Sequence, residues 1–319
     1  MITFKKVTKS YADGVQAVKS LQLEIHKGEF FVLIGPSGCG KTTTLKMVNR
    51  LIDPSEGSIW INDQDIAHVN IHELRWNIGY VLQQIALFPH LSIAENIAIV
   101  PELKKWEKER INSRVDELLA MVGLEPKIYR DRKPTELSGG EQQRIGVARA
   151  LAADPPIILM DEPFSALDPI SREKLQNDIL QLQKSIHKTI VFVTHDMQEA
   201  LKLGDRICLM KQGEVIQVGT KDELVENPVN DFVREFVGTK SDLHTVDLDI
   251  TRIMRPVNQV EEKMETIPVE TTLGNVLKKL AERDELSVEK DGKVIGIVDR
   301  QTVLNYMAEH LQEGGEKNE

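Results

Sequence analysis

The stretch "FFVLIGPSGCGKT", residues 30–42, decides the fold. It opens with an uninterrupted apolar run, which is typical of a strand buried on both faces. The remainder fits the phosphate-loop pattern G-x-x-x-x-G-K-[ST]. Beyond it, Leu45, Val48 and Leu51 recur at helical spacing. The sequence therefore predicts a strand, a glycine-rich loop and a helix in this order.

The chemistry of this loop favours phosphate binding. Its glycines let successive backbone N–H groups turn inward around an anion, and the helix that follows adds partial positive charge. Lys41 can reach the β- and γ-phosphates, and the Thr42 hydroxyl can ligate Mg²⁺. Cys39 stands at a free position of the pattern, so packing explains it better than redox chemistry. The residues expected to bind nucleotide here are Gly35, Pro36, Ser37, Gly38, Cys39, Gly40, Lys41, Thr42 and Thr43.

A second buried run, "IILMDEP" at residues 157–163, ends on two adjacent carboxylates. If this strand neighbours the phosphate-loop strand in the sheet, its last residues lie beside the bound Mg²⁺. Asp161 then has a cation to compensate its charge, and Glu162 can orient or deprotonate the water that attacks the γ-phosphate. By itself the pair also fits two solvated loop residues.

The rest of the N-terminal part continues the strand and helix alternation. Leu21, Leu23 and Ile25 alternate with polar residues, residues 190–193 ("IVFV") form another buried run, and residues 92–122 are rich in helix formers. Fully apolar strands alternating with helices indicate a parallel sheet covered on both faces.

Composition limits the function classes. The chain has 319 residues, 41% of them hydrophobic, and a net charge of −10. The acidic balance argues against a general nucleic-acid binder. No apolar run approaches the ~20 residues of a membrane-spanning helix, and the charged, alternating start does not resemble a signal peptide. Two cysteines, Cys39 and Cys208, are too few for a disulfide framework or a zinc site, so we expect reduced thiols.

The most specific string is "LSGGEQQR", residues 137–144. Ser138 is a good helix N-cap, and the two glycines after it expose backbone N–H groups, which makes a second anion-binding helix start. Placed upstream of "IILMDEP", the string resembles the signature motif of the ATP-binding-cassette (ABC) ATPases over residues 2–238. The resemblance implies an α/β phosphate-loop domain with a mainly parallel sheet, an antiparallel β subdomain and a helical subdomain at about residues 88–145.

Further roles are implied by this resemblance. Tyr11 corresponds to the aromatic residue that stacks on adenine, and Gln83 to the glutamine that senses Mg²⁺ and the attacking water, with Gln84 as the neighbouring alternative. Asp168, in "SALD", matches the loop that communicates across the dimer, and His195, in "VFVTHD", matches the switch histidine. The implied cofactors are ATP and Mg²⁺. The expected metal ligands are Thr42, Gln83 and Asp161, and the expected catalytic residues are Glu162, His195 and Gln83.

In the family mechanism two copies pair head to tail. The phosphate loop of one copy and the signature of the other, here Ser138, Gly139, Gly140 and Glu141, enclose one ATP. The resemblance therefore implies a homodimer held together by nucleotide, and a chain that is monomeric or weakly dimeric without it.

A cassette without a membrane span needs partners for transport. The resemblance implies integral membrane permease subunits docked near "LFPHLSIAENI" (87–97), a substrate-binding protein beyond them, and a peripheral position at the cytoplasmic face of the membrane. The alternatives are an importer of another small solute, such as an amino acid or a polyamine, and a soluble ATPase of DNA repair or translation. The short segment between Gln83 and Ser138 and the acidic charge disfavour the latter.

A composition change near Gly238 predicts a linker at 239–250 and a small domain at 251–310, followed by a disordered tail at 311–319. The small domain resembles a CBS module, with a helix at 272–283 and two strands around Asp291-Gly292. Where many such modules place Ser or Thr and then Asp to hold a ribose, this chain has Asp299 and then Thr302. It could sense a nucleotide or ionic strength, or only dimerise. A cassette followed by a CBS-like domain is similar to the ATPase subunits of importers for glycine betaine, carnitine or choline.

Overall fold

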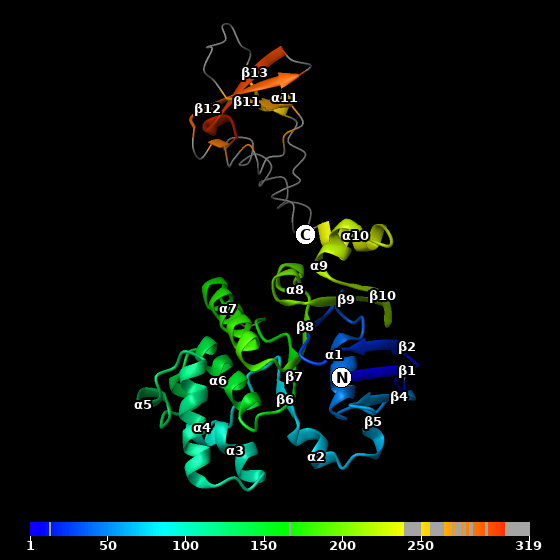
Figure 1. Cartoon of the computed structure of the whole chain (residues 1–319), viewed down its shortest axis with the longest axis vertical. Coiled ribbons are helices and arrows are strands. Elements are labelled where there is room, and N and C mark those ends of the chain that lie inside the picture. Colours follow the sequence, from blue (N-terminus) through cyan, green and yellow to red (C-terminus); the bar gives the residue numbers. More distant parts are fainter. Residues whose placement is uncertain are drawn as a thin grey trace. The chain divides into compact units, whose positions relative to one another are not determined.

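The computed structural model describes residues 1–12, 14–165, 167–238, 250–255, 265–269, 271, 276, 279–280, 283–290 and 293–303. The chain divides into two compact units, Met1–Phe236 and Val237–Glu319. Each unit is described by itself below (Figure 1).

A six-stranded sheet forms the centre of the first unit, in the order β10-β9-β3-β8-β7-β6. Every pair in it is parallel except β9 and β10 at one edge, which are antiparallel. Its strands are β3 (Phe30–Ile34), β6 (Ile78–Val81), β7 (Ile157–Asp161), β8 (Thr189–Thr194), β9 (Arg206–Lys211) and β10 (Glu214–Gly219). Every residue of β3, β7 and β8 is buried, as strands covered on both faces require. The predicted α/β fold with a mainly parallel sheet is confirmed.

The strand order corrects one expectation. β7, which carries the acidic pair, does not neighbour β3, because β8 lies between them. The acidic pair nevertheless reaches the phosphate loop, because helix α1 (Lys41–Val48) contacts both β8 and β7. Contact with α1, rather than pairing of β7 with β3, therefore brings the acidic pair close to the phosphate loop.

A second, antiparallel sheet packs beside the first. Its order is β2-β1-β4-β5, from β1 (Ile2–Ser10), β2 (Gln16–Ile25), β4 (Glu56–Ile61) and β5 (Gln64–Asp65). Inward residues of this sheet, such as Phe4 and Leu21, share one buried cluster with Leu33 of β3, Leu159 of β7 and Leu45 of α1. The cluster fixes α1, and so the loop before it, between the two sheets. The short helices η1 (Ile66–His68) and α2 (Ile71–Trp76) connect this sheet to β6.

Helices between β6 and β7 form a separate block, which Figure 1 shows on the side of the molecule away from β1 and β2. They are α3 (Ile93–Leu103), α4 (Lys108–Met121), α5 (Pro126–Tyr129), η2 (Pro134–Glu136) and α6 (Gly139–Leu151). The helical stretch expected at 92–122 is two helices. Ser92 and Glu95 form a capping box at the start of α3, and Lys105 adopts φ 55° between the helices. α6 contacts β6, α3, α4 and α7.

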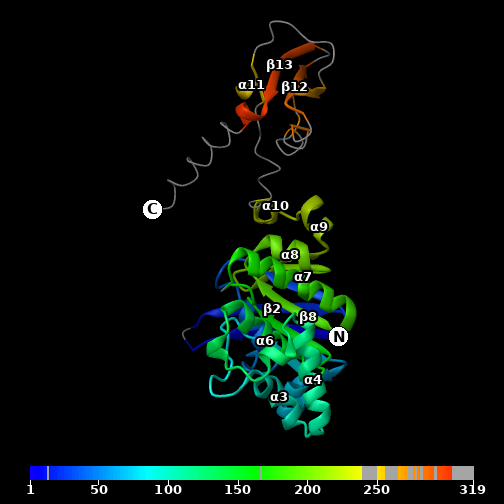
Figure 2. The same cartoon turned by 90° about the vertical axis from the view of Figure 1, so that its left-hand side faces the viewer.

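The remaining helices up to Gly238 follow β7 (α7), β8 (α8) and β10 (α9 and α10), and Figure 2 shows α7 beside α8. They are α7 (Pro169–Ile186), α8 (Met197–Leu203), α9 (Lys221–Glu226) and α10 (Asp231–Gly238). Among the described residues, none of the helices is both long enough and apolar enough to cross a membrane.

The second unit contains a three-stranded sheet in the order β11-β12-β13. Its elements are α11 (Ile250–Ile253), β11 (Thr266–Pro268), β12 (Glu285–Lys290) and β13 (Lys293–Asp299). The two strands expected around Asp291-Gly292 are present and antiparallel, and β11 pairs with β12 in parallel. Ile250, Ile267, Leu286 and Val298 belong to its small core. Most of the helix expected at 272–283, residues 239–249 of the linker expected at 239–250, and the tail expected at 311–319 lie outside the described residues. The last linker residue, Ile250, begins α11.

Candidate functional site

The phosphate loop leaves β3 and enters α1 through a backbone that two glycines make possible. Gly35 has φ 152°, and a Cβ atom on it would lie 2.1 Å from the Met210 carbonyl oxygen. Gly40 has φ 103°, and a Cβ atom on it would lie 2.3 Å from the Ala17 carbonyl oxygen. A side chain at either position is excluded by contact and disfavoured by φ. The loop is thus held against neighbouring backbone on both flanks.

The start of α1 carries no side-chain cap, because its N-cap residue is Gly40. The first N–H groups of any helix lack acceptors within the helix, so they favour an anion at this point. Lys41 is buried, and its Nζ donates to the carbonyl oxygens of Gly35 at 2.7 Å and Pro36 at 3.0 Å. Pro36, Ser37 and Gly38 are exposed, whereas Cys39 is buried, as packing requires. Burial raises the pKa of the Cys39 thiol, so it is a poor thiolate.

Asp161, the last residue of β7, lies against this helix start. Its Oδ1 accepts a hydrogen bond from the Thr42 hydroxyl at 2.8 Å, and its Oδ2 accepts one from the Tyr80 hydroxyl at 3.4 Å. Burial raises the pKa of this carboxyl, while the Thr42 hydrogen bond and the charge of Lys46 oppose the rise. Burial also raises the pKa of Tyr80, with Asp161 as the second cause. Two hydroxyl donors therefore hold one buried carboxylate.

Glu162 lies in contact with two other predicted site residues, Gln83 and His195. It adopts φ 44°, and its backbone N–H donates to the Val193 carbonyl oxygen at 3.0 Å. Gln83 Nε2 donates to Glu162 Oε2 at 3.3 Å, and His195 Nδ1 lies 3.2 Å from the same oxygen. The Glu162 side chain is 19% exposed and that of His195 is 58% exposed. One shielded carboxylate therefore faces an amide and an imidazole that solvent can reach.

Hydrogen bonds of its two neighbours, Thr194 and Asp196, fix the loop that carries His195. The Thr194 hydroxyl donates to Glu199 Oε2 at 2.5 Å and accepts from the Asp196 N–H at 3.0 Å. Asp196 in turn caps α8 by accepting from the Gln198 N–H. Burial raises the pKa of Glu199, and the Thr194 hydrogen bond opposes the rise. The histidine is thus exposed at its ring but fixed at its backbone.

The signature residues start α6 in a closed arrangement. The Ser138 hydroxyl accepts from the Glu141 N–H at 3.4 Å, and Glu141 Oε2 accepts from the Ser138 N–H at 2.8 Å. The Tyr129 hydroxyl donates to the other Glu141 oxygen at 2.6 Å and is the first cause that lowers the pKa of that carboxyl. Gly139 and Gly140 form the first turn. This helix start is capped by its own side chains.

The two predicted anion sites are not in contact within one chain. α1 packs on β2, β7 and β8, whereas α6 packs on β6 and on other helices, and Figure 1 shows them in different parts of the unit. Asp168 lies at the start of α7, where its Oδ1 accepts from the N–H groups of Ile170 and Ser171. Tyr11 is 41% exposed at the end of β1, with Lys9 Nζ 5.4 Å from its ring centre. Thr43 is half-buried in the first turn of α1.

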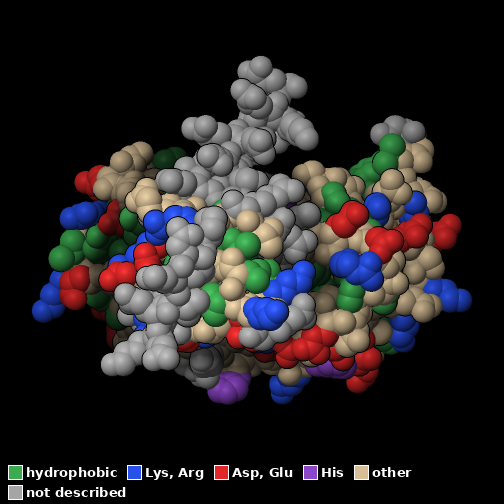
Figure 3. Space-filling model, turned by 90° about the horizontal axis from the view of Figure 1, so that it is seen from above, with side chains coloured by type: hydrophobic (Ala, Val, Ile, Leu, Met, Phe, Trp, Pro, Cys, Tyr) green, Lys and Arg blue, Asp and Glu red, His purple; other side chains and the backbone are tan. Residues whose placement is uncertain are grey.

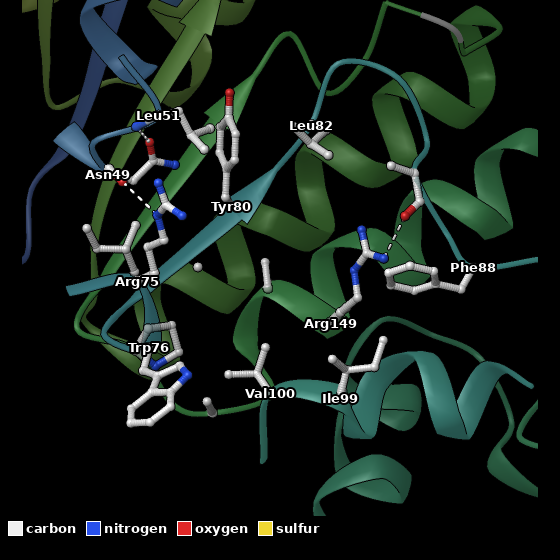
Figure 4. A pocket seen from close by; sticks show the side chains of 16 residues that line it. Asn49, Leu51, Arg75, Trp76, Tyr80, Leu82, Phe88, Ile99, Val100 and Arg149 are labelled. Atoms are coloured by element: carbon white, nitrogen blue, oxygen red, sulfur yellow. Dashed lines mark hydrogen bonds between the residues drawn. The ribbon is translucent and has the colours of Figure 1, made fainter. Parts of the chain in front are cut away.

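An apolar groove of about 480 Å³ lies between β6 and the helical block. Figure 4 shows Arg75 and Trp76 at one end, Phe88 and Arg149 at the other, and Tyr80 and Leu82 between Leu51 and Phe88. Arg149, from α6, donates to the Ala86 carbonyl oxygen at 2.7 Å, and burial lowers the pKa of its guanidinium. The lining residues are Asn49, Leu51, Arg75, Trp76, Ile78, Gly79, Tyr80, Leu82, Ala86, Phe88, Ile99, Val100, Arg149, Ala150, Ala153 and Pro155.

Sequence reasoning missed Tyr80 and Arg149. In the sequence, Tyr80 looks like an ordinary aromatic residue of a strand, and Arg149 like an ordinary basic residue of a helix. The signal that pointed to this region was the segment around Phe88, predicted to receive a partner, and Phe88 is 46% exposed in the groove. The partners of Tyr80 and Arg149 lie far along the chain, so no local pattern indicates them.

In the second unit, the exchanged residues Asp299 and Thr302 bind each other. The Thr302 N–H donates to Asp299 Oδ1 at 2.8 Å, and the Asp299 N–H donates to the Thr302 hydroxyl at 3.2 Å. Arg255 pairs with the other oxygen of Asp299 and with Glu285. The Asp299 carboxylate is thus engaged within the unit by a cap and an ion pair.

Comparison with known proteins gives the following similarities. The family model of ABC transporters matches residues 18–165. The glycine betaine/carnitine/choline transport ATP-binding protein of Bacillus subtilis is 52% identical over 95% of this chain and 77% of its own length. The choline transport ATP-binding protein of the same organism is 50% identical over 98% of this chain and 84% of its own length.

Among solved structures, the dimeric structure of a post-hydrolysis state of an ATP-binding cassette bound to ADP and Pi matches with a TM-score of 0.63. It is 39% identical and covers 69% of this chain and 98% of its own. The similarity to the transport proteins extends over nearly the whole chain, whereas the solved cassette covers a smaller share of it.

Proposed function

This chain belongs to the ATP-binding proteins of ABC transporters, within the group of glycine betaine, carnitine and choline importers, and from this premise we propose how its own residues turn ATP hydrolysis into uptake of such a quaternary amine. The observation that carries the proposal is Glu162. Glu162 follows Asp161, which accepts a hydrogen bond from Thr42. The Oε2 atom of its shielded carboxylate lies within 3.3 Å of both Gln83 Nε2 and His195 Nδ1.

The phosphate loop binds the triphosphate of ATP. The uncapped N–H groups at the start of α1 donate to phosphate oxygens, and Lys41 exchanges its two carbonyl partners for the β- and γ-phosphates. Tyr11, exposed at the end of β1, is available to stack on adenine. The remaining loop residues present their backbone to the phosphates because no larger residue fits at Gly35 or Gly40.

The residues beside the loop fit a magnesium ion bound mainly by substrate. Thr42, Asp161 and Gln83 offer oxygen ligands, and among the described residues no cluster of three or more His, Cys, Asp or Glu side chains could hold a metal by itself. Such a partial ligand set is typical of Mg²⁺, which takes its other ligands from phosphate and water. Mg²⁺ bound there would neutralise the charge that develops on the phosphates.

Glu162 acts on the attacking water. It accepts the proton of the water, while Gln83 orients the water and would offer its amide oxygen to the magnesium ion. The structure supports Gln83 over Gln84 for this role, because Gln83 is the one that donates to Glu162. His195, held by its fixed backbone, donates to the γ-phosphate.

The second ATP-binding surface comes from another copy of the chain. Ser138, Gly139, Gly140 and Glu141 lie apart from the phosphate loop of their own chain, so they close the site only in a head-to-tail homodimer. Asp168, at the start of α7, would relay the state of one site to the other. The solved cassette bound to ADP and Pi, 39% identical to this chain, is itself dimeric, which supports a dimer here.

The groove of Figure 4 is the expected contact with the membrane subunits. It is apolar, includes the exposed Phe88 and Leu51, and joins the loop that carries Gln83 to the helical block. A short helix of a permease subunit fits such a groove. Through this contact the chain is held at the cytoplasmic face of the membrane, and a substrate-binding protein delivers the amine on the other side.

The C-terminal unit is proposed to be a CBS-like regulatory or dimerising domain. The Asp299–Thr302 pair and the Arg255 ion pair favour a structural or ionic input over ribose binding at this position. A soluble role on nucleic acid is disfavoured, because the net charge is −10 and the face in Figure 3 shows both acidic and basic side chains. Import of another small solute is the second candidate, because the proposed site residues of this chain contact ATP and not the transported solute.

Glu162→Gln tests the proposal. The amide keeps the size of the side chain but accepts no proton, so ATP hydrolysis falls by at least about 100-fold while ATP binding persists. With ATP and Mg²⁺ the variant should elute as a dimer and the wild type mainly as a monomer, as measured by phosphate release and by size-exclusion chromatography with light scattering.

The matched control is Glu214→Gln, because the Glu214 side chain on β10 is 58% exposed and its one ion pair among the described residues is with Lys19 at 3.4 Å. An exposed ion pair contributes little, so this variant should retain both rate and elution volume. Wild-type hydrolysis by the Glu162 variant would remove Glu162 from its proposed role.

A further inference from the structure

Tyr80 joins the groove to the ATP site. It is part of β6, and its ring lines the groove between Leu51 and Leu82, as Figure 4 shows. Its hydroxyl lies beyond the groove wall and donates to Asp161 Oδ2 at 3.4 Å. One side chain thus has its apolar part in the docking surface and its polar end on a proposed magnesium ligand.

Other polar groove residues end on backbone atoms. Arg149 donates to the carbonyl oxygen of Ala86, and Arg75 donates to those of Asn49 and Arg50. These bonds hold the shape of the groove. Among the described residues that line it, Tyr80 is the one whose side-chain hydrogen bond reaches the acidic pair.

Asp161 depends on this bond for its orientation. The residue is 3% exposed, and its two carboxylate oxygens accept from two different hydroxyls, that of Thr42 on Oδ1 and that of Tyr80 on Oδ2. When Thr42 turns to a metal ion, the Tyr80 hydroxyl remains to fix the carboxylate plane. A bond of 3.4 Å is near the long limit, so a small movement of the ring is enough to make or break it.

We propose that Tyr80 is a positioning residue that orients Asp161 for Mg²⁺ and makes this orientation respond to a permease helix packed in the groove. The second part rests on the proposed docking of a permease helix there. A helix seated against the ring shifts the hydroxyl relative to Asp161, and so changes how well the site holds Mg²⁺ with ATP. The phosphate loop itself is not touched by this movement.

The first test is Tyr80→Phe in the full-length chain, which keeps the ring and removes the hydroxyl. Affinity for a non-hydrolysable ATP analogue is measured by calorimetry with Mg²⁺ and with EDTA. We expect the gain in affinity due to Mg²⁺ to fall by about 3- to 10-fold, as for loss of a long bond to a charged group, while the affinity in EDTA stays within about twofold.

The control for removal of a hydroxyl is Ser55→Ala. Within the described part of the chain, the Ser55 hydroxyl, just before β4, bonds to the backbone of Ser10 and not to the acidic pair. It should leave both affinities unchanged. Equal loss with Mg²⁺ and EDTA in the Tyr80 variant, or no loss in either, overturns the positioning role. A wild-type chain that binds no ATP analogue instead contradicts the proposed function.

The second test replaces the permease helix by a label. Leu51 lies beside Tyr80 and is 49% exposed, so Leu51→Cys places a thiol there that a reagent can reach. The native Cys39 and Cys208 are buried and should not react. A bulky maleimide on that thiol should lower the Mg²⁺-dependent gain when Tyr80 is present and cause no further loss in the Tyr80→Phe background. Equal effects of the label in both backgrounds overturn the link between groove and Asp161.

Discussion

The starts of α1 and α6 are prepared for anions in opposite ways. α1 begins after Gly40, which offers no side-chain cap, and the loop before it is fixed by glycines that touch neighbouring backbone. α6 begins after Ser138, whose hydroxyl and backbone N–H are both engaged by Glu141. The start of α1 has no side-chain cap, whereas the start of α6 has a capping box that engages the N–H groups of Ser138 and Glu141.

Under the proposed function, this difference would let two phosphate-binding surfaces coexist in one chain. An uncapped helix start would bind ATP in the single chain at the cost of intrinsic helix stability. A self-capped start stabilises the free chain and would become a ligand site only where a partner copy presents ATP. The first start would then bind nucleotide, and the second would respond to nucleotide that is already bound.

The largest expected effect comes from alanine at one glycine of each start. Gly40→Ala brings Cβ to within 2.3 Å of the Ala17 carbonyl oxygen at φ 103°, so the loop must shift and its N–H groups with it. We expect ATP affinity to fall by at least about 100-fold and the free energy of unfolding by about 1–3 kcal/mol. Calorimetry of ATP binding and urea unfolding measure the two effects.

Gly139→Ala is the matched variant at the other start. No atom lies within 4 Å of the added Cβ, and the residue belongs to the first turn of α6. We expect unchanged ATP affinity in the single chain and a free energy of unfolding equal to or up to about 1 kcal/mol above wild type. Similar losses of single-chain ATP affinity in both variants would break the comparison.

Local features of this comparison could be predicted from the sequence. β3 spans the expected residues 30–34, and the buried runs at 157–159 and 190–193 lie within β7 and β8, because an unbroken apolar run has few alternatives in a globular chain. Ser138 as an N-cap followed by Glu141 follows from capping chemistry alone. These features depend on neighbours within a few residues.

Features that depend on distant pairing could not be predicted. The sequence does not indicate that β8 separates β3 from β7, because strand order depends on how crossover helices pack. The contacts of Tyr80 and Gln83 with the acidic pair follow from the pairing of β6 with β7, where Tyr80 lies opposite Leu159. The choice between Gln83 and Gln84 needed that register.

An effect of intermediate size is expected on the melting temperature of variants at the two helix starts. Lys41→Ala removes the cation of the first start, so saturating Mg²⁺ and ATP should no longer raise the melting temperature, a loss of about 2.7 kcal/mol at 100 times the dissociation constant. Ser138→Ala loses a cap worth about 0.5–1 kcal/mol without nucleotide, and should keep the rise caused by ATP. Thermal unfolding with and without Mg²⁺ and ATP measures both, and an ATP-induced rise lost in the Ser138 variant would contradict the assignment.

The smallest effect concerns the pH dependence of the closed start. The Tyr129 hydroxyl and the Ser138 N–H hold the pKa of Glu141 below its ordinary value of 4.5. A carboxyl with a lowered pKa in the folded chain stabilises it above the unfolded pKa and loses this contribution as the pH falls through the folded pKa. Glu141→Gln should therefore melt slightly lower than wild type near neutral pH, and the difference should shrink as the pH falls below about 4.5. α1 has no acidic residue in its first turn, so that turn contributes no equivalent pH dependence. Asp161, which accepts from Thr42 beside the open start, has a raised pKa, so its contribution has the opposite sign. A difference between wild type and Glu141→Gln that persists unchanged at low pH would mean that shape, rather than charge, keeps the second start closed.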